Sequence, residues 1–211
     1  MVEFTVVIPT FNEEKHIAKT MRSILNNLFD LNLHPEVIVV DDSTDSTADI
    51  LKGVQGQFPV LRVIHRKNAT GVGSAIRLGI EKAKGKYIIV YMADAPDDIK
   101  YFPVILSKLR QGYDIVQTSR FFRQSRIEGY PFRKRVCNWA CNTFINLAFL
   151  EFKLRDFSSL FKAFSRKRVL GLKLEATKFD LGLEIVLKAM KKNYRIVEVP
   201  VDWKEREAGE S

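Results

Sequence analysis

The chain has 211 residues, of which 46% are hydrophobic and 28% are charged. This length and composition are typical of one large globular domain and exclude a disordered or fibrous chain. The net charge of +9 favours an anionic partner, such as a phosphorylated substrate, nucleic acid or an anionic membrane surface. No stretch reaches the roughly 18 consecutive apolar residues of a spanning helix. Without a recognisable signal peptide, and with only Cys137 and Cys141 as thiols, we expect a cytoplasmic protein that is soluble or lies on a membrane.

Apolar runs that predict buried strands alternate along the chain with amphipathic stretches that predict helices. The expected strands cover 4–9, 35–40, 60–65, 87–92, 113–118 and 195–201. The expected helices cover 13–28, a short stretch through 50–54, 71–83, 99–109, 136–150 and 178–192. This alternation predicts an α/β fold with a mostly parallel central sheet flanked by helices. No repeat or flexible linker divides the chain, so we expect residues 1–211 to form a single domain.

Carboxylates follow three of the expected strands. The first strand ends in PTFNEE, the second in VVDDSTD and the fourth in MADAPDD. The carboxyl ends of parallel strands meet at one edge of a sheet, where open α/β sheets bind their ligands. Asp94, Asp97 and Asp98 offer the oxygen ligands that a hard divalent cation prefers, and through it they would hold a diphosphate. The alternative is a polar loop in which Asp97 or Asp98 caps the helix that starts near Ile99, while Asp41, Asp42 and Asp45 merely cap the second helix.

The character of the chain changes after Ser119. Six basic residues surround the single acid Glu128 in this segment, namely Arg120, Arg123, Arg126, Arg133, Lys134 and Arg135, and four aromatic residues lie between them. The uncharged stretch 136–150 follows, in which asparagines recur every four residues (Asn138, Asn142 and Asn146) and predict one polar stripe on an apolar helix. A solvated charged face is one interpretation of the basic run. Stacking on single-stranded nucleic acid is another, but the acidic strand ends oppose it and we expect no nucleic-acid partner.

The sequence resembles glycosyltransferase family 2, of the nucleotide-binding type called GT-A, and within it the dolichyl-phosphate mannose synthase group. The resemblance rests on VVIPTFNEE (6–14), VIVVDDSTDST (37–47), GVGSAIRLGIEKAKGKYIIVYMAD (71–94), SRF (119–121), RDFSSLFKAF (155–164) and YRIVEVPVDWKEREAGES (194–211). These stretches follow the family order over essentially the whole chain. The resemblance implies a GT-A, Rossmann-like fold and the transfer of a sugar from a nucleotide-sugar donor.

The resemblance also implies roles for individual residues. It places the nucleotide at Pro9, Phe11, Glu13, Val40, Asp42, Ala93 and Asp94, with Phe11 standing where the family usually has tyrosine. Asp94 matches the last aspartate of the Asp-X-Asp metal motif, whereas Met92 replaces the first. We therefore expect Mg²⁺ or Mn²⁺ to be held by Asp94 together with Asp97 or Asp98. Arg120 and Arg206 match basic residues that meet the phosphates, and we expect Arg133 and Arg135 to assist them.

The choice of acceptor depends on proton chemistry. A hydroxyl acceptor needs a general base, whereas a phosphate monoester is already anionic and needs only cations to position it. The basic segment and the apolar helix, about 119–150 together, favour a polyprenyl (dolichyl or undecaprenyl) phosphate. We thus expect inverting transfer of a mannose- or glucose-type hexose from a GDP- or UDP-sugar, with peripheral contact to the cytoplasmic face of a membrane.

Two alternatives stay open. In the first, the acceptor is a sugar or protein hydroxyl and Asp156 of RDFSSLF is the base, although this carboxylate would equally well bond Ser158 or Ser159 as a structural group. In the second, the chain is a nucleotide-sugar binder without catalytic activity, because its metal site has decayed at Met92.

Overall fold

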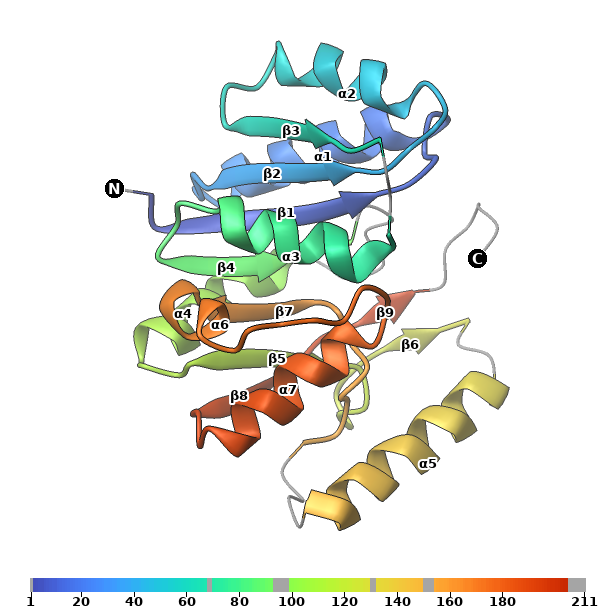
Figure 1. Ribbon diagram of the computed structural model, residues 1–211, viewed down its shortest axis with the longest axis vertical. Coiled ribbons are helices and arrows are strands. Elements are labelled where there is room, and N and C mark those ends of the chain that lie inside the picture. Colours follow the sequence, from blue (N-terminus) through green and yellow to red (C-terminus); the bar gives the residue numbers. More distant parts are fainter. Residues whose placement is uncertain (1, 68–69, 93–98, 130–131, 150–153, 205–211) are drawn as a thin grey trace.

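A seven-stranded sheet forms the centre of the computed structural model, which describes residues 2–67, 70–92, 99–129, 132–149 and 154–204 (Figure 1). The strand order is β3-β2-β1-β4-β7-β5-β8. The strands are β1 (Phe4–Thr10), β2 (Glu36–Asp41), β3 (Leu61–His65), β4 (Tyr87–Val90), β5 (Ile115–Ser119), β7 (Lys162–Ser165) and β8 (Ile196–Pro200), while β6 (Ile127–Glu128) and β9 (Trp203–Lys204) pair separately. Only β7 runs antiparallel to its neighbours in the seven-stranded sheet, so the predicted α/β fold with a mostly parallel sheet is confirmed.

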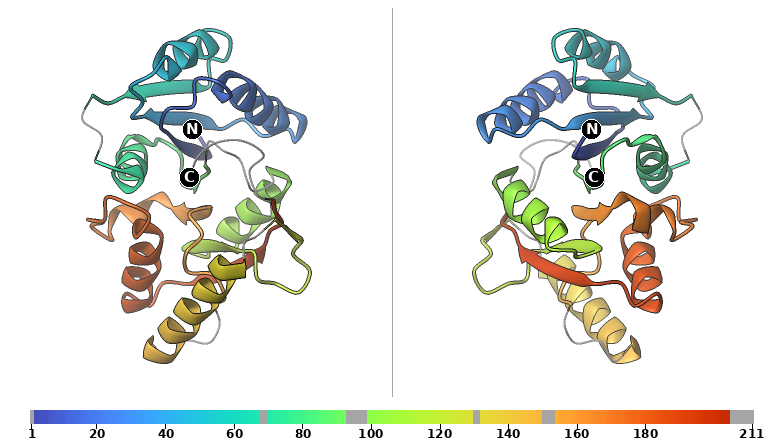
Figure 2. Two further views of the ribbon diagram at one scale, coloured as in Figure 1. Left: turned by 90° about the vertical axis from the view of Figure 1, so that its right-hand side faces the viewer. Right: turned by 90° about the vertical axis from the view of Figure 1, so that its left-hand side faces the viewer.

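Helices cover both faces of the sheet, as the two side views in Figure 2 show. One face carries α1 (Ile17–Asp30), α2 (Thr47–Gln55) and α4 (Phe102–Arg110), and the other carries α3 (Val72–Lys82), α6 (Arg166–Leu170) and α7 (Leu181–Lys191). A short 3₁₀ turn, η1 (Ile99–Tyr101), precedes α4. Successive side chains of β1 enter opposite cores, because strand side chains alternate between the two faces: Val6 and Ile8 pack in one core and Val7 in the other.

The approach of α3 to β1 is unusually close. A methyl group added at Gly79 would lie 2.3 Å from a methyl carbon of Val7. Glycine at this position therefore lets the helix settle directly on the strand. Since α3 begins beside the carboxyl end of the sheet, this close packing also fixes the position of the residues around Ser74.

The helix α5 (Phe132–Phe149) stands away from the sheet, at the lower end of the molecule in Figure 1. Its inner side carries the buried Asn142 and the partly buried Ile145, which packs against Leu154, Phe157 and Val186. Its outer side exposes large apolar side chains, namely Val136 by 45%, Phe144 by 72% and Leu147 by 58%, and Trp139, at the border between the inner and outer sides, is 69% exposed. Among the described residues, no helix combines the length and the hydrophobicity that crossing a membrane requires.

Three predictions of secondary structure need correction, and one strand was not predicted. The first helix starts at Ile17 rather than Glu13, because Asn12 has a left-handed backbone (φ 52°) and the next residues form a turn. The fourth strand ends at Val90, where its pairing with β7 also ends, rather than at Met92. The helix predicted for 136–150 begins four residues earlier, inside the basic segment. The strand β7 was not predicted, because four residues carry too little periodicity to announce it.

The sheet topology brings distant segments to one edge. The strand order reverses between β1 and β4, with β2 on one side of β1 and β4 on the other, which is the switch point where open α/β sheets bind ligands. Because β7 runs antiparallel, its first residue, Lys162, lies at the same edge as the last residues of β1, β2 and β5.

Candidate functional site

The edge of the sheet where β1, β2 and β5 end has two halves. The first half is here called the carboxylate edge, and it consists of residues 10–13 and 41–45 together with His65, Arg66 and Ser74. At its centre Asp41 is fully buried and ties three strands together. Its Oδ1 accepts hydrogen bonds from the hydroxyls of Thr10 (2.9 Å) and Ser43 (2.6 Å), and its Oδ2 lies 2.7 Å from Nδ1 of His65. This first acid of the DDSTD stretch is therefore a structural group.

The next acid, Asp42, forms a bidentate ion pair with Arg66. The guanidinium donates from Nε to Oδ1 over 2.6 Å and from Nη2 to Oδ2 over 2.5 Å, and Nη2 also lies 3.0 Å from the hydroxyl of Ser74. Sequence reasoning missed Arg66. The signal was present, because β2 and β3 are adjacent parallel strands in which Asp41 pairs with His65, so the residues that follow each strand lie side by side.

Phe11 lies on the surface of the carboxylate edge, directly after β1. The left-handed Asn12 donates its backbone N–H to Ser43 Oγ (2.7 Å) and accepts from the backbone of Thr44 (2.9 Å), and this turn leaves the Phe11 ring 60% exposed. Glu13 is only partly buried, and its backbone donates to the Thr47 hydroxyl over 2.8 Å. The structure thus presents an exposed, flat aromatic surface at the carboxylate edge.

The other predicted nucleotide contacts lie deeper or outside the described residues. Pro9 and Val40 are paired in the sheet and buried, so their side chains belong to the core and only their backbone faces the edge. Ala93, Asp94, Asp97, Asp98 and Arg206 lie outside the described residues. Of the expected cap residues, Asp45 accepts a hydrogen bond from the backbone of Thr47 (3.0 Å) in the first turn of α2. Asp97 and Asp98, the other proposed caps, are among the undescribed residues.

The metal hypothesis rests on the same undescribed acids. Within the described ranges, no three histidine, cysteine, aspartate or glutamate side chains gather as a group that would hold a metal ion. The described residues therefore supply no complete ligand set, and Asp94, Asp97 and Asp98 stay the predicted ligands.

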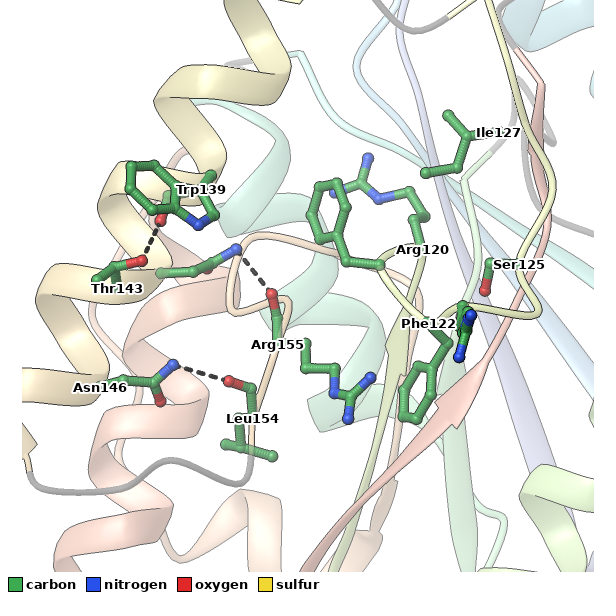
Figure 3. Close-up of a pocket in the computed structure, with 12 residues that line it drawn as sticks. Arg120, Phe122, Ser125, Ile127, Trp139, Thr143, Asn146, Leu154 and Arg155 are labelled. Carbon is green, nitrogen blue, oxygen red and sulfur yellow. Dashed lines mark hydrogen bonds between the residues drawn. The ribbon is translucent and has the colours of Figure 1, made fainter.

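The other half of the edge contains a cavity of about 750 Å³, here called the arginine pocket (Figure 3). It opens between the loop after β5, the inner side of α5 and the start of the 154–157 turn. Its lining combines three arginines with aromatic, aliphatic and amide side chains: Arg120, Phe121, Phe122, Arg123, Ser125, Ile127, Trp139, Asn142, Thr143, Asn146, Leu154 and Arg155. Such a lining suits a ligand with an anionic head and an apolar body.

Arg120 is anchored by Asp156, which is fully buried. Nε and Nη2 of the guanidinium donate to the two carboxylate oxygens over 2.9 and 3.2 Å, and Nη2 also reaches the hydroxyl of Ser158 (3.1 Å). The same carboxylate accepts from the Ser158 hydroxyl (2.9 Å) and from the backbone of Ser159 (3.2 Å). These contacts are those of the structural carboxylate that was one of the two interpretations of Asp156.

A second cation enters the pocket from the 154–157 turn. The guanidinium carbon of Arg155 lies 4.5 Å from the ring centre of Phe122, within cation–π distance, so the ring orients the charge. Sequence reasoning missed Arg155 and Arg123 as pocket residues. Of the cations it named, Arg133 is exposed on the first turn of α5, and the side chain of Arg135 lies outside the description.

Buried charges lie beneath the arginine pocket. Lys162 is 1% exposed and donates to the side chain of Gln117 and to the backbone oxygen of Phe157 (3.2 Å). Burial lowers the pKa of Lys162 to about 7, against the opposing attraction of Asp156. Burial also raises the pKa of Glu198 to about 7, although its Oε1 accepts backbone hydrogen bonds from Arg155 (2.7 Å) and Asp156 (3.1 Å).

Comparison with known proteins identifies the family. The model of glycosyl transferase family 2 matches residues 5–170. The chain belongs to this family. The predicted family and the GT-A fold are thereby confirmed.

Relatives and solved structures agree with this assignment. The dolichol-phosphate mannosyltransferase of Pyrococcus furiosus is 29% identical over 100% of this chain and 59% of its own length. The undecaprenyl-phosphate mannosyltransferase of Micrococcus luteus is 28% identical over 97% of this chain and 85% of its own. A crystal structure of glucosyl-3-phosphoglycerate synthase from Mycobacterium tuberculosis, in complex with Mn²⁺, UDP and glucosyl-3-phosphoglycerate, matches with a TM-score of 0.72 at 18% identity, covering 99% of this chain and 73% of that one. This chain thus spans less than two thirds of the Pyrococcus protein.

Proposed function

We propose that this glycosyltransferase moves a hexose from a nucleoside diphosphate sugar to a polyprenyl phosphate, with inversion at the anomeric carbon. The observation that carries the proposal is the arginine pocket, in which guanidinium groups and apolar side chains lie together beside the ligand-binding edge of the sheet. The names of the two mannosyltransferase relatives, which refer to dolichol phosphate and undecaprenyl phosphate, support the same acceptor class.

The donor binds at the carboxylate edge in this proposal. The exposed ring of Phe11 offers a stacking surface, and the side chain of Asp42, held by Arg66, accepts hydrogen bonds from the nucleoside. Asp94, with Asp97 or Asp98, would hold the predicted Mg²⁺ or Mn²⁺, and such an ion neutralises the diphosphate when it is bound. Arg206 is proposed to meet the same phosphates, as the family pattern implies.

The acceptor phosphate binds at the arginine pocket in this proposal. One of its oxygens attacks the anomeric carbon opposite the diphosphate, a new carbon–oxygen bond forms, and the bond to the nucleoside diphosphate breaks. No proton has to be removed, because the phosphate monoester is already anionic. The main obstacle is repulsion, since each pair of unit charges 4 Å apart costs about 4 kcal/mol at an effective dielectric of 20. Arg120 and Arg155 counter that repulsion, with Arg133 and Arg135 as further predicted cations.

The apolar chain of the acceptor requires a path from a membrane to the pocket. Trp139 both lines the arginine pocket and is 69% exposed, and Phe144 and Leu147 continue the exposed apolar surface along α5. We propose that this outer side of α5 lies in the membrane interface, where apolar side chains bury themselves among the lipids and nearby arginines meet anionic head groups. The helix would thus lead the polyprenyl chain directly to the arginines.

A transfer assay tests the proposal. Purified protein is incubated with radiolabelled GDP-mannose or UDP-glucose, Mg²⁺ or Mn²⁺ and a short polyprenyl phosphate, and the product is extracted into organic solvent. We expect lipid-soluble label with one donor. The variant Arg120→Ala should lose it, whereas Arg168→Ala, which removes a remote arginine paired with Asp114 over 2.8 Å, should retain it. Donor binding without any transfer would overturn the proposal in favour of a nucleotide-sugar binder.

A further inference from the structure

The 154–157 turn, residues Leu154 to Phe157, is tied to its surroundings by side chains from four elements. Its backbone N–H groups at Arg155 and Asp156 donate to Glu198 of β8. Its backbone oxygens accept from Gln117 of β5, Lys162 of β7, and Asn142 and Asn146 of α5. A turn that depended only on local contacts would have no such external partners. Its conformation is therefore set by the relative positions of α5 and the sheet.

This turn positions two cations of the arginine pocket, Arg155 and Arg120. Arg155 belongs to the turn and lies over Phe122. Arg120 is held by Asp156, which also belongs to the turn and accepts hydrogen bonds from the guanidinium through both carboxylate oxygens. A displacement of the turn would consequently move both guanidinium groups at once, and positioning errors of about 1 Å in a reacting group are costly for catalysis.

Asn142 connects α5 to both sides of the turn. Its side-chain N–H donates to the backbone oxygen of Arg155 over 2.8 Å, and its side-chain oxygen accepts from the backbone N–H of Phe157 over 3.2 Å. The side chain is 7% exposed, so water does not readily replace these bonds. Asn146, one turn later on the helix, makes a single bond to the backbone oxygen of Leu154 over 3.0 Å. Figure 3 shows the amide group of Asn146 reaching from α5 to the backbone of Leu154.

We propose that Asn142 is a positioning residue for the acceptor site, because it fastens the 154–157 turn to α5 and so holds Arg120 and Arg155 at the arginine pocket. The inference rests on the proposed function, since it assumes that the pocket binds an acceptor phosphate. It goes further in making the placement of α5 a determinant of phosphate binding. The helix whose outer side is proposed to lie in the membrane thereby also sets the geometry of the cations.

The test compares Asn142→Ala and Asn142→Asp with the wild-type protein. The alanine loses both hydrogen bonds, and the aspartate places a carboxylate against the backbone oxygen of Arg155. For both variants we expect KM for a short polyprenyl phosphate to rise at least tenfold, whereas KM for the donor stays within twofold. Asn146→Ala should raise the acceptor KM by about threefold, because only one bond is lost. Asn27→Ala, on the exposed side of α1, is the matched control and should change neither constant.

The outcomes that overturn the inference are specific. An unchanged acceptor KM in a folded Asn142 variant, or an equal rise of both KM values, excludes a positioning role. If both Asn142 variants fail to fold, Asn146→Ala decides, and an unchanged acceptor KM in it overturns the inference. If the wild-type protein transfers no sugar, the proposed function fails, and calorimetric binding of geranyl phosphate takes the place of the assay. Binding that is tenfold weaker in Asn142→Ala then supports the inference, whereas equal binding, or none to the wild type, overturns it.

Discussion

The carboxylate edge and the arginine pocket lie at the same edge of the sheet but are built by different means. At the carboxylate edge, side chains that follow adjacent parallel strands bind one another directly, as Asp42 and Arg66 do. At the arginine pocket, Arg120 is held indirectly. It binds Asp156, and Asp156 belongs to a turn that is fastened by side chains of α5 and of three strands. The first arrangement is determined by strand register, whereas the second depends on the packing of a helix that stands off the sheet.

The two halves also differ in charge. The carboxylate edge contains four acids, Glu13, Asp41, Asp42 and Asp45, and one arginine, Arg66, so its formal charge is negative and it offers hydrogen-bond acceptors to the polar groups of a nucleoside. The arginine pocket brings Arg120, Arg123 and Arg155 together and suits a phosphate. A reaction between two anions requires such a cationic half. The predictions below separate the two halves by asking which substrate each substitution affects.

The largest effect is expected from breaking the Arg120–Asp156 pair. Arg120→Ala and Asp156→Asn should each lower kcat/KM for the lipid acceptor about 100-fold, and the double variant should be hardly worse than either, because residues that act as one unit are not additive. Steady-state kinetics on the three variants provide the measurement. If Asp156 is instead a general base for a hydroxyl acceptor, Asp156→Asn will lose far more activity than Arg120→Ala, and the enzyme will accept a water-soluble sugar.

A smaller effect, on the donor rather than on the lipid acceptor, is expected at the carboxylate edge. Asp42→Ala removes the side chain proposed to accept hydrogen bonds from the nucleoside, and it leaves Arg66 without its carboxylate. KM for the nucleotide sugar should therefore rise about tenfold, while KM for the polyprenyl phosphate stays within twofold. Asp49→Ala is the control, since it removes an exposed acid of α2 that pairs with Lys52 over 2.8 Å. A comparable rise of both KM values for Asp42→Ala would show that the two halves are not independent.

How much of this could be predicted from sequence follows from the same contrast. Alternating apolar runs predicted the parallel strands and both helical layers, and the acids after β1 and β2 were expected at one edge because parallel strands end together. Arg66 was within reach of that reasoning, since it follows the neighbouring strand. It was not predicted, because only the acidic residues after the strands were considered as ligands at this edge.

The arginine pocket was less predictable for a physical reason. Arg120 was named from a family pattern, but Arg155 becomes a pocket residue only because an unpredicted strand, β7, turns the chain back beside β5. The regular spacing of Asn142 and Asn146 indicated a polar stripe on α5. That this stripe would bind the backbone of a turn, and leave the apolar side exposed, depends on a tertiary contact that no local pattern encodes.

The exposed side of α5 gives the third prediction. The double variant Phe144→Ser and Leu147→Ser should weaken binding to vesicles that contain anionic lipid several-fold, because contact with the membrane interface provides only a part of the about 1.5–3 kcal/mol that full burial of each such side chain is worth. Sedimentation with vesicles measures the effect, and Val104→Ser, on the 40% exposed Val104 of α4, is the control. Unchanged vesicle binding would assign this apolar surface to something other than a membrane.

The smallest expected effect concerns the stability of the wild-type protein relative to Lys162→Met. Because burial lowers the pKa of Lys162 to about 7 in the folded protein, while an unfolded lysine keeps its usual value of about 10.5, the unfolded state binds the extra proton between these pH values. Stability rises with pH wherever the unfolded state binds more protons. The wild-type melting temperature should therefore rise relative to that of Lys162→Met between pH 7 and pH 9.5, by about 2–4 °C for each kcal/mol of this linkage in a domain of this size. Glu198 is retained in both proteins and its raised pKa acts between about 4.5 and 7, so it does not affect the comparison. If the difference between the two melting temperatures does not change with pH, Lys162 stays charged on folding, and the backbone oxygen of Phe157 then accepts from a buried ammonium group rather than from a neutral amine.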